Sequence, residues 1–124
     1  MPFDPYMQKA LLDWCLGGAT PTRPTNWFIG FETTSPTSVS DFAAPGSRAT
    51  ATFQSASTGV SASASLKAAL TCTMTAACTV IGWAVYNSSS GGQRLMYGTL
   101  TASQTCASGD APAFVAANLK ITLA

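Results

Sequence analysis

The chain has 124 residues, a length that fits one hydrophobic core, and only 9% of them are charged. Six Lys and Arg residues oppose five Asp and Glu residues, without a basic cluster and without any His, so the usual source of nucleic-acid affinity is missing. Ordinary soluble chains carry about 25% charged residues. A surface of Ala, Ser and Thr favours contact between subunits, and we expect a homo-oligomer, a dimer or a trimer, although an extracellular Ser/Thr-rich domain has a similar composition.

The chain opens with an amphipathic helix that we place from Pro5 to Leu16. The apolar positions at helical spacing are Phe3, Met7, Ala10, Leu11 and Trp14. Asp4 lies in the first turn, and Gly17 with Gly18 supplies a C-terminal stop. The stretch "GGATPTRPTN" that follows reads as an extended or turning arm. We therefore divide a chain of one domain into a helix and arm over residues 1–25 and a β body over residues 26–124.

The β body contains short strands separated by turn signals. "NWFIGFE" alternates, "ATATFQ" and "VSASAS" alternate more weakly with mostly Ala as apolar residues, and "PAFVAA" and "LKITLA" close the chain. "TVIGWAVYN", residues 79–87, is apolar on both faces and predicts a central strand. "NSSSGG" predicts a turn that returns the chain through "QRLMYGTL" as a hairpin. The pattern predicts a mainly β fold, a small antiparallel β-sandwich or jelly roll, with the N-terminal helix outside its core.

Residues that could carry chemistry are few and scattered. The five acids do not pair. Without His, a Ser nucleophile could be activated only by a Lys, and the one local candidate is Ser65 with Lys67, which we interpret as solvent-exposed surface residues. We therefore expect no enzyme and no cofactor. Four cysteines without a Cys-x-x-Cys spacing give no metal site. Cys72 and Cys78 either face each other across a hairpin and oxidise outside a reducing cell, or belong with the other two as small buried thiols.

Neither a membrane span nor a secretory signal is expected. No apolar run reaches the roughly 18 residues that a span needs, and "MPFDPYMQKA" is too acidic and polar for a signal sequence. We therefore expect a chain that starts at Met1 or Pro2 and is made in a cytoplasm.

Several short motifs in a fixed order carry a family resemblance over nearly the whole chain. They are "LLDW", "TRP", "WFIGF", "SPT", Arg48 followed five residues later by Phe53, "SSGG" with "LMYGTL", "SGD" and "LKITL". In this order the chain resembles small bacteriophage virion structural proteins, which are often labelled tail-fibre or capsid decoration proteins. The resemblance implies a structural component of the virion, made in the host cytoplasm.

Within a virion, we expect a capsid decoration or cement protein that binds the major capsid protein and stabilises the shell. The alternative is a tail, baseplate or tail-fibre attachment protein that is anchored to other tail proteins by its N-terminal helix. A carbohydrate-binding β-sandwich module is a more remote alternative. The expected partner-binding residues are Phe3, Met7, Leu11 and Trp14 as apolar anchors and Arg23 for orientation. The competing interpretation is that this helix face covers the protein's own β body.

Overall fold

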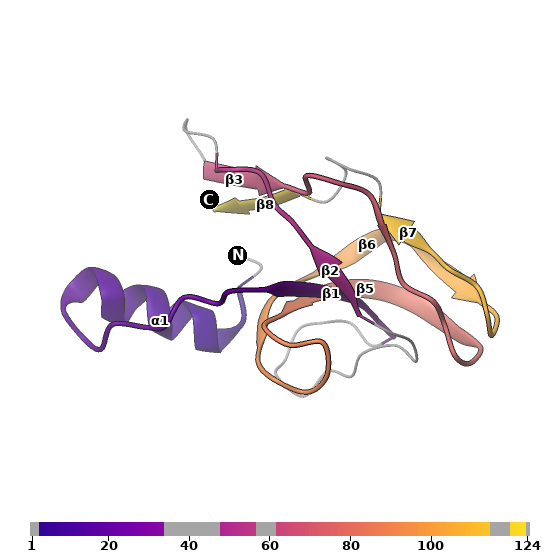
Figure 1. The fold of residues 1–124 in the computed structure, drawn as a ribbon, viewed down its shortest axis with the longest axis horizontal. Coiled ribbons are helices and arrows are strands. Elements are labelled where there is room, and N and C mark those ends of the chain that lie inside the picture. Colours follow the sequence, from indigo (N-terminus) through magenta and orange to yellow (C-terminus); the bar gives the residue numbers. More distant parts are fainter. Residues whose placement is uncertain (1–2, 34–47, 57–61, 115–119, 124) are drawn as a thin grey trace.

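A computed structural model describes residues 3–33, 48–56, 62–114 and 120–123 of the chain (Figure 1). The first element is the helix α1 (Pro5–Leu16), and the elements described after it are strands. In chain order these strands are β1 (Trp27–Glu32), β2 (Ala49–Ala51), β3 (Ala62–Ser65), β4 (Leu70–Thr71), β5 (Cys78–Tyr86), β6 (Arg94–Cys106), β7 (Ala113–Phe114) and β8 (Lys120–Leu123). The predicted mainly β class with one N-terminal helix is confirmed.

Local sequence signals set both ends of α1. Asp4 is the N-cap residue, and its Oδ1 accepts a hydrogen bond from the backbone N–H of Tyr6 at 3.1 Å. Pro5 follows in the first turn, where the missing N–H of proline costs no helical hydrogen bond. Gly17 ends the helix with a φ of 83°, a left-handed conformation that glycine adopts without a Cβ clash. The predicted span of the helix is therefore confirmed.

β5 is an inner strand of a four-stranded antiparallel sheet with the order β2-β1-β5-β6. This position confirms the prediction from its apolar sequence, because both faces and both edges of β5 are covered. The hairpin between β5 and β6 is confirmed as well, with Tyr86 opposite Arg94 beside the turn. β6 is longer than "QRLMYGTL" predicts, because the polar residues that follow continue the pairing as far as Cys106, which lies opposite Cys78.

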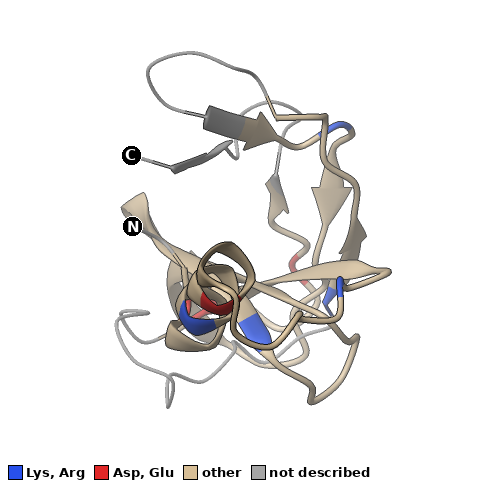
Figure 2. Ribbon diagram, turned by 90° about the vertical axis from the view of Figure 1, so that its left-hand side faces the viewer, with Lys and Arg blue, Asp and Glu red and all other residues tan. Residues whose placement is uncertain are grey.

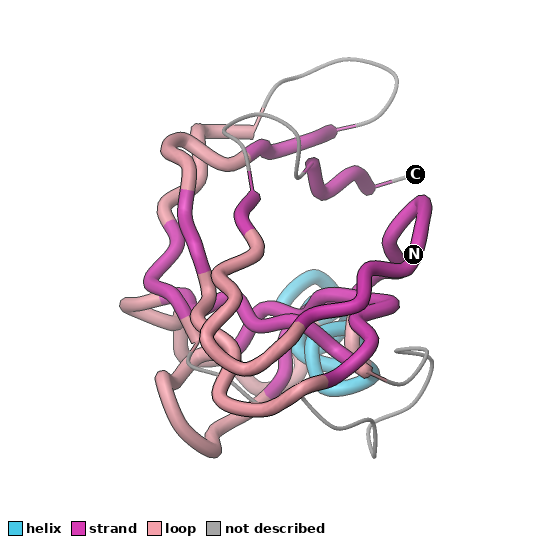
Figure 3. Tube along the Cα trace, turned by 90° about the vertical axis from the view of Figure 1, so that its right-hand side faces the viewer, coloured by secondary structure: helices cyan, strands magenta, loops and turns pink. Residues whose placement is uncertain are grey.

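The remaining described strands form two separate antiparallel pairs, β3 with β8 and β4 with β7. Figures 1 and 3 show the β3–β8 pair apart from the four-stranded sheet, on the side where the C-terminus lies. In the part of the chain that the structure describes, these pairs do not join into a second continuous sheet, so the predicted sandwich or jelly roll is not shown. One physical reason lies in β3, whose only apolar residues are Ala and which therefore offers little apolar area on which to build a second layer.

The core gathers side chains from the sheet and from the segments that cross it. Its buried members are Phe3, Ile29, Phe31, Ala51, Leu66, Cys72, Met74, Val80, Trp83, Val85 and Cys106. The indole of Trp83 lies against Gly98, its cross-strand neighbour on β6. A Cβ at Gly98 would come within 2.6 Å of the Trp83 ring, so glycine is required at this close approach.

Candidate functional site

The start of α1 is fixed to the outer edge of β6. The backbone N–H of Asp4 donates to the carbonyl oxygen of Leu95 at 2.9 Å, and Phe3 forms an antiparallel bridge with Met96. Arg94 Nε donates to Asp4 Oδ2 at 3.0 Å, and the two side chains are only 5% and 1% exposed. A charge-assisted hydrogen bond at such a site is strong, because water does not screen it. The helix is therefore held at its N-terminal end by both backbone and side-chain contacts.

Three of the predicted anchor residues lie on the inner side of this attachment. Phe3 is 6% exposed and belongs to the core, while Met7 and Leu11 are partly buried and pack against the core. The side chain of Phe3 is therefore covered by the protein's own sheet, and a role for Phe3 in binding a partner stays a prediction. For Phe3, the interpretation that the helix face covers the β body describes the structure better.

The far half of the helix carries large apolar side chains that the β body leaves exposed. We call residues 11–16 the projecting helix end, because Figure 1 shows α1 extending to one side of the sheet. Trp14 is 66% exposed, as the anchor prediction requires, but Leu12 at 61% and Leu16 at 80% are equally prominent and were missed. One residue turns a helix by about 100°, so Leu12 points away from the inner side that Leu11 occupies. The run "LL" contained this signal, because two adjacent leucines cannot share one narrow helix face.

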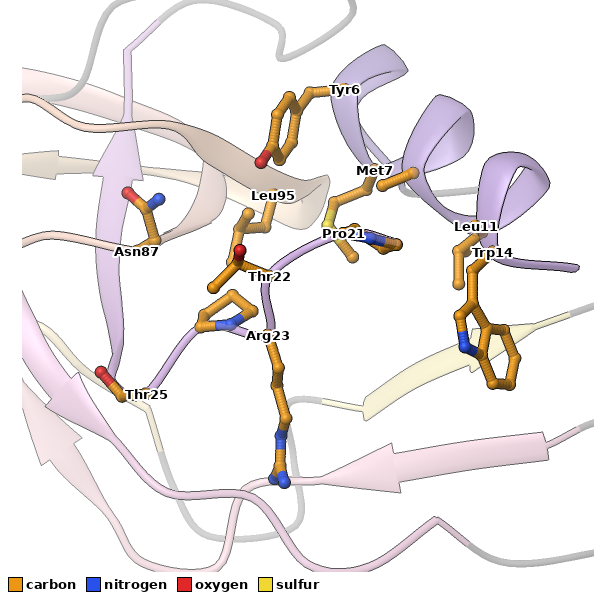
Figure 4. Close-up of a pocket in the computed structure, with 12 residues that line it drawn as sticks. Tyr6, Met7, Leu11, Trp14, Pro21, Thr22, Arg23, Thr25, Asn87 and Leu95 are labelled. Atoms are coloured by element: carbon orange, nitrogen blue, oxygen red, sulfur yellow. The ribbon is translucent and has the colours of Figure 1, made fainter. Parts of the chain in front are cut away.

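A groove of about 670 Å³ runs along the side of the projecting helix end that carries Leu11 and Trp14 (Figure 4). Its lining residues are Tyr6, Met7, Ala10, Leu11, Trp14, Pro21, Thr22, Arg23, Pro24, Thr25, Asn87 and Leu95. The Pro-containing segment 21–25, which belongs to the stretch predicted as an extended or turning arm, forms the wall opposite the helix. Arg23 belongs to this wall, and its guanidinium lies 5.7 Å from the centre of the Trp27 ring. Helix and arm thus bring Leu11, Trp14 and Arg23 to one site.

A buried polar cluster ties the β5–β6 turn to the sheet. The Tyr86 hydroxyl donates to Glu32 Oε1 at 2.5 Å, and the Arg48 guanidinium lies 3.4 Å from the centre of the Tyr86 ring. Arg48 also donates to the carbonyl oxygens of Ser88 and Gly91. Burial, together with the hydrogen bond to Glu32, raises the pKa of Tyr86 well above its ordinary value. The sequence did not predict this cluster, because its members are far apart along the chain.

The cysteines are free thiols, and their placement differs from the predicted hairpin pair. Cys72 is buried and its thiol donates to the carbonyl oxygen of Ile29 at 3.4 Å. The residue opposite Cys78 is Cys106 rather than Cys72, because β5 pairs with β6 and not with the segment before it. The alternative of four buried thiols is also inexact, since Cys78 is partly exposed and Cys15 is exposed on the helix.

Charge does not mark a site in the described residues. Figure 2 shows their basic and acidic residues spread over the fold rather than gathered on one face. Among these residues, no group of three or more His, Cys, Asp or Glu side chains forms a candidate metal site. No helix in the same part of the chain is long and apolar enough to cross a membrane. The projecting helix end and its groove are therefore the feature that we consider for binding.

Comparison with known proteins gives a family for the chain. A family model described as Podophage GP4 fiber I protein gp80 matches residues 2–122, while no curated protein matches. This is a family of structural fibre proteins and not an enzyme family, in agreement with the resemblance to phage virion proteins. The match supports the tail-fibre alternative, and the capsid decoration role that we expected first finds no support in it. The chain therefore belongs to the family of the podophage fiber I protein gp80, as a fibre component of a phage virion.

Proposed function

We propose that this fibre protein attaches to another tail protein of the same virion by inserting its projecting helix end into a pocket of that partner. The observation that carries the proposal is the exposure of three large apolar side chains on this half of the helix. Leu12 and Leu16 lie on one side and Trp14 on the other, and each is more than half exposed. Large apolar side chains that stay exposed on two sides of a helix mark a surface for a partner, which would contact the helix on both of these sides.

The way in which α1 is held fits an anchor. Its first turn is fixed to β6 by the bridge at Phe3 and by the buried pair of Asp4 and Arg94, so the projecting helix end has a defined direction. A rigidly presented helix loses little conformational entropy when it binds. The groove between Trp14 and the 21–25 segment offers the partner a second apolar surface beside the helix. The protein, made in the host cytoplasm, would join the tail through passive apolar contact without a chemical reaction.

The test replaces the two outward leucines, which the structure keeps away from the protein's own core. Leu12→Gln together with Leu16→Gln retains good helix formers and removes two apolar side chains. Burial of one Leu contributes about 1.5–3 kcal/mol, so the loss of two costs at least about 3 kcal/mol, and the double variant is expected to bind its partner at least roughly 100-fold more weakly. The matched control is Ala68→Gln with Ala69→Gln, two exposed positions in the bend between β3 and β4.

The readout is the amount of protein in purified particles made from phage that carry each variant. We expect the double Leu variant to fold with an unchanged circular dichroism spectrum and to be almost absent from particles, while the Ala control is incorporated normally. Particles blocked before tail attachment should lack the protein altogether, whereas a capsid decoration protein would remain on them. Full incorporation of the double Leu variant would refute the anchor. A stable oligomer of the isolated protein that this variant dissociates would instead assign the surface to a second copy of the chain.

A further inference from the structure

Cys78 and Cys106 stand directly opposite each other at the open end of the β5–β6 hairpin. Cys78 is the first residue of β5 and Cys106 is the last residue of β6. Directly opposed residues in antiparallel strands have Cα atoms about 4.5–5.5 Å apart and side chains on the same face. A disulfide accepts Cα separations of about 4.4–6.8 Å. The backbone register therefore already meets the Cα separation that a cross-strand disulfide requires.

The surroundings hold this end of the hairpin in place. The backbone N–H of Met74 donates to the carbonyl oxygen of Asp110 at 2.7 Å, and the N–H of Gly109 donates to the carbonyl oxygen of Met74 at 2.8 Å. These bonds connect the segment just before Cys78 to the turn just after Cys106. The Cys78 sulfur also lies 3.9 Å from the sulfur of Met74, which is itself buried. The two cysteines are thus kept next to each other by contacts on both sides of the hairpin.

The two thiols differ in access in the way that stepwise oxidation needs. Cys78 is partly exposed, so a small oxidant can reach it, whereas Cys106 is only 2% exposed. The second step is intramolecular, so Cys106 needs contact only with Cys78. Cys72 has a different neighbourhood, because its thiol is bonded to the carbonyl oxygen of Ile29 and its backbone N–H to Pro112. The geometry therefore favours a disulfide between Cys78 and Cys106 over one that involves Cys72.

We propose that Cys78 and Cys106 form an intramolecular disulfide when the protein leaves a reducing cytoplasm and meets a disulfide oxidant such as glutathione disulfide. The Cys78 thiolate attacks one sulfur of the oxidant, which gives a mixed disulfide and releases one glutathione thiolate. The Cys106 thiolate then attacks the Cys78 sulfur and releases the second glutathione. The cysteine pair loses two protons and two electrons, and glutathione disulfide takes up the electrons and becomes two thiols.

The disulfide would act as a modification that closes the sheet. The turn beside Tyr86 and Arg94 already closes one end of the β5–β6 hairpin, and the new bond would close the other. Burial raises the pKa of the Cys106 thiol, and the neighbouring Cys78 and Asp110 raise it further. Because only the thiolate reacts, oxidation is expected to become faster as the pH rises. This inference does not depend on what the projecting helix end binds.

The experiment uses the full chain with Cys15→Ser, which removes the exposed helix thiol and leaves three cysteines. The protein is incubated with glutathione disulfide, denatured and alkylated, and its intact mass and cross-linked peptides are measured. We expect three alkylated thiols before oxidation and one afterwards, with Cys78 joined to Cys106 in the peptide map. The midpoint of thermal unfolding should rise by roughly 10 °C on oxidation and return with a reductant.

Two single variants test whether the disulfide joins Cys78 to Cys106, with the buried thiol of Cys72 as the control. Cys72→Ala should retain the loss of two alkylatable thiols and the thermal shift, whereas Cys78→Ser should lose both. Cys78 is the better position to change, since Cys106 is more deeply buried and its replacement is more disruptive. Three alkylatable thiols after prolonged oxidation at alkaline pH would overturn the proposal. A peptide map that joins Cys72 to Cys78 would overturn it as well, even if the protein becomes more stable.

Discussion

The buried pair of Asp4 and Arg94 gives the sharpest prediction about the attachment of α1. Asp4 has two roles, since Oδ1 caps the helix at the N–H of Tyr6 and Oδ2 accepts from Arg94 Nε at 3.0 Å. Asp4→Asn keeps the cap, because Asn is as good an N-cap residue as Asp, and replaces the Oδ2 acceptor with an NH2 donor, so the ion pair with Arg94 and its hydrogen bond are lost. Asp4→Ala removes both. The difference between the two variants therefore separates the ion pair from the cap.

The expected magnitude follows from burial. Loss of one partner of a buried ion pair costs about 3–5 kcal/mol, because the other charge stays in a poorly solvated site. The Arg94 guanidinium also lies 4.6 Å from the centre of the Tyr97 ring, so we take the lower end, about 3 kcal/mol, for Asp4→Asn. Loss of the cap adds about 1 kcal/mol in Asp4→Ala. For a chain of this length, the free-energy loss in Asp4→Asn lowers the midpoint of thermal unfolding by about 12 °C.

The assay is equilibrium unfolding in urea, followed by circular dichroism and Trp fluorescence. The matched control is Asp13→Asn on the same helix, where the pair with Lys9 is solvent-exposed and its loss should cost below about 1 kcal/mol. Arg94→Met in the Asp4→Asn background should recover part of the loss, because it removes the buried cation that has lost Asp4 as its anionic partner. If Asp4→Asn is as stable as the unchanged protein, the pair does not hold the helix, and the reasoning fails.

Three further predictions concern the core, the buried tyrosine and the helix end. The raised pKa of Tyr86 contributes stability that is fully present below about pH 10 and is lost as the pH rises through the folded-state value. Tyr86→Phe should therefore flatten the alkaline fall of the unfolding free energy, whereas the control Tyr6→Phe should leave it. An unchanged fall in Tyr86→Phe would contradict the raised pKa. Gly98→Ala should lower the free energy of unfolding by about 1–3 kcal/mol, because the new Cβ would press on the Trp83 ring. The control is Ala102→Val at an exposed position of the same strand, and an unchanged midpoint of thermal unfolding in Gly98→Ala would argue against the close contact. Gly17→Ala should lower the free energy of unfolding by about 1 kcal/mol, and Gly17→Asn should lower it less, because Asn tolerates the left-handed conformation. Equal losses of unfolding free energy in the two variants would speak against a left-handed residue at the end of the helix.

Features built from neighbouring residues could be predicted from the sequence. The cap at Asp4, the proline beside it and the stop at Gly17 act within a few residues, so both ends of α1 followed from local chemistry. The apolar stretch 79–87 had to lie inside a sheet, because neither of its faces could be left to water. The fixed order of short motifs also led to the phage virion family that the family match supports.

Features built from distant residues were decided by the tertiary structure. The pairing of β5 with β6 determined that Cys78 faces Cys106, and the packing of α1 on β6 determined that Phe3 is core while Leu12 and Leu16 are exposed. The buried partner of Asp4 lies 90 residues away in the chain. Helical periodicity tells which side chains share a face, but it does not tell how much of the helix its own sheet will cover. The extent of this coverage depends on where the contact between α1 and β6 begins and ends. The residues inside this contact hold the protein together, and the residues beyond it remain free to bind a partner.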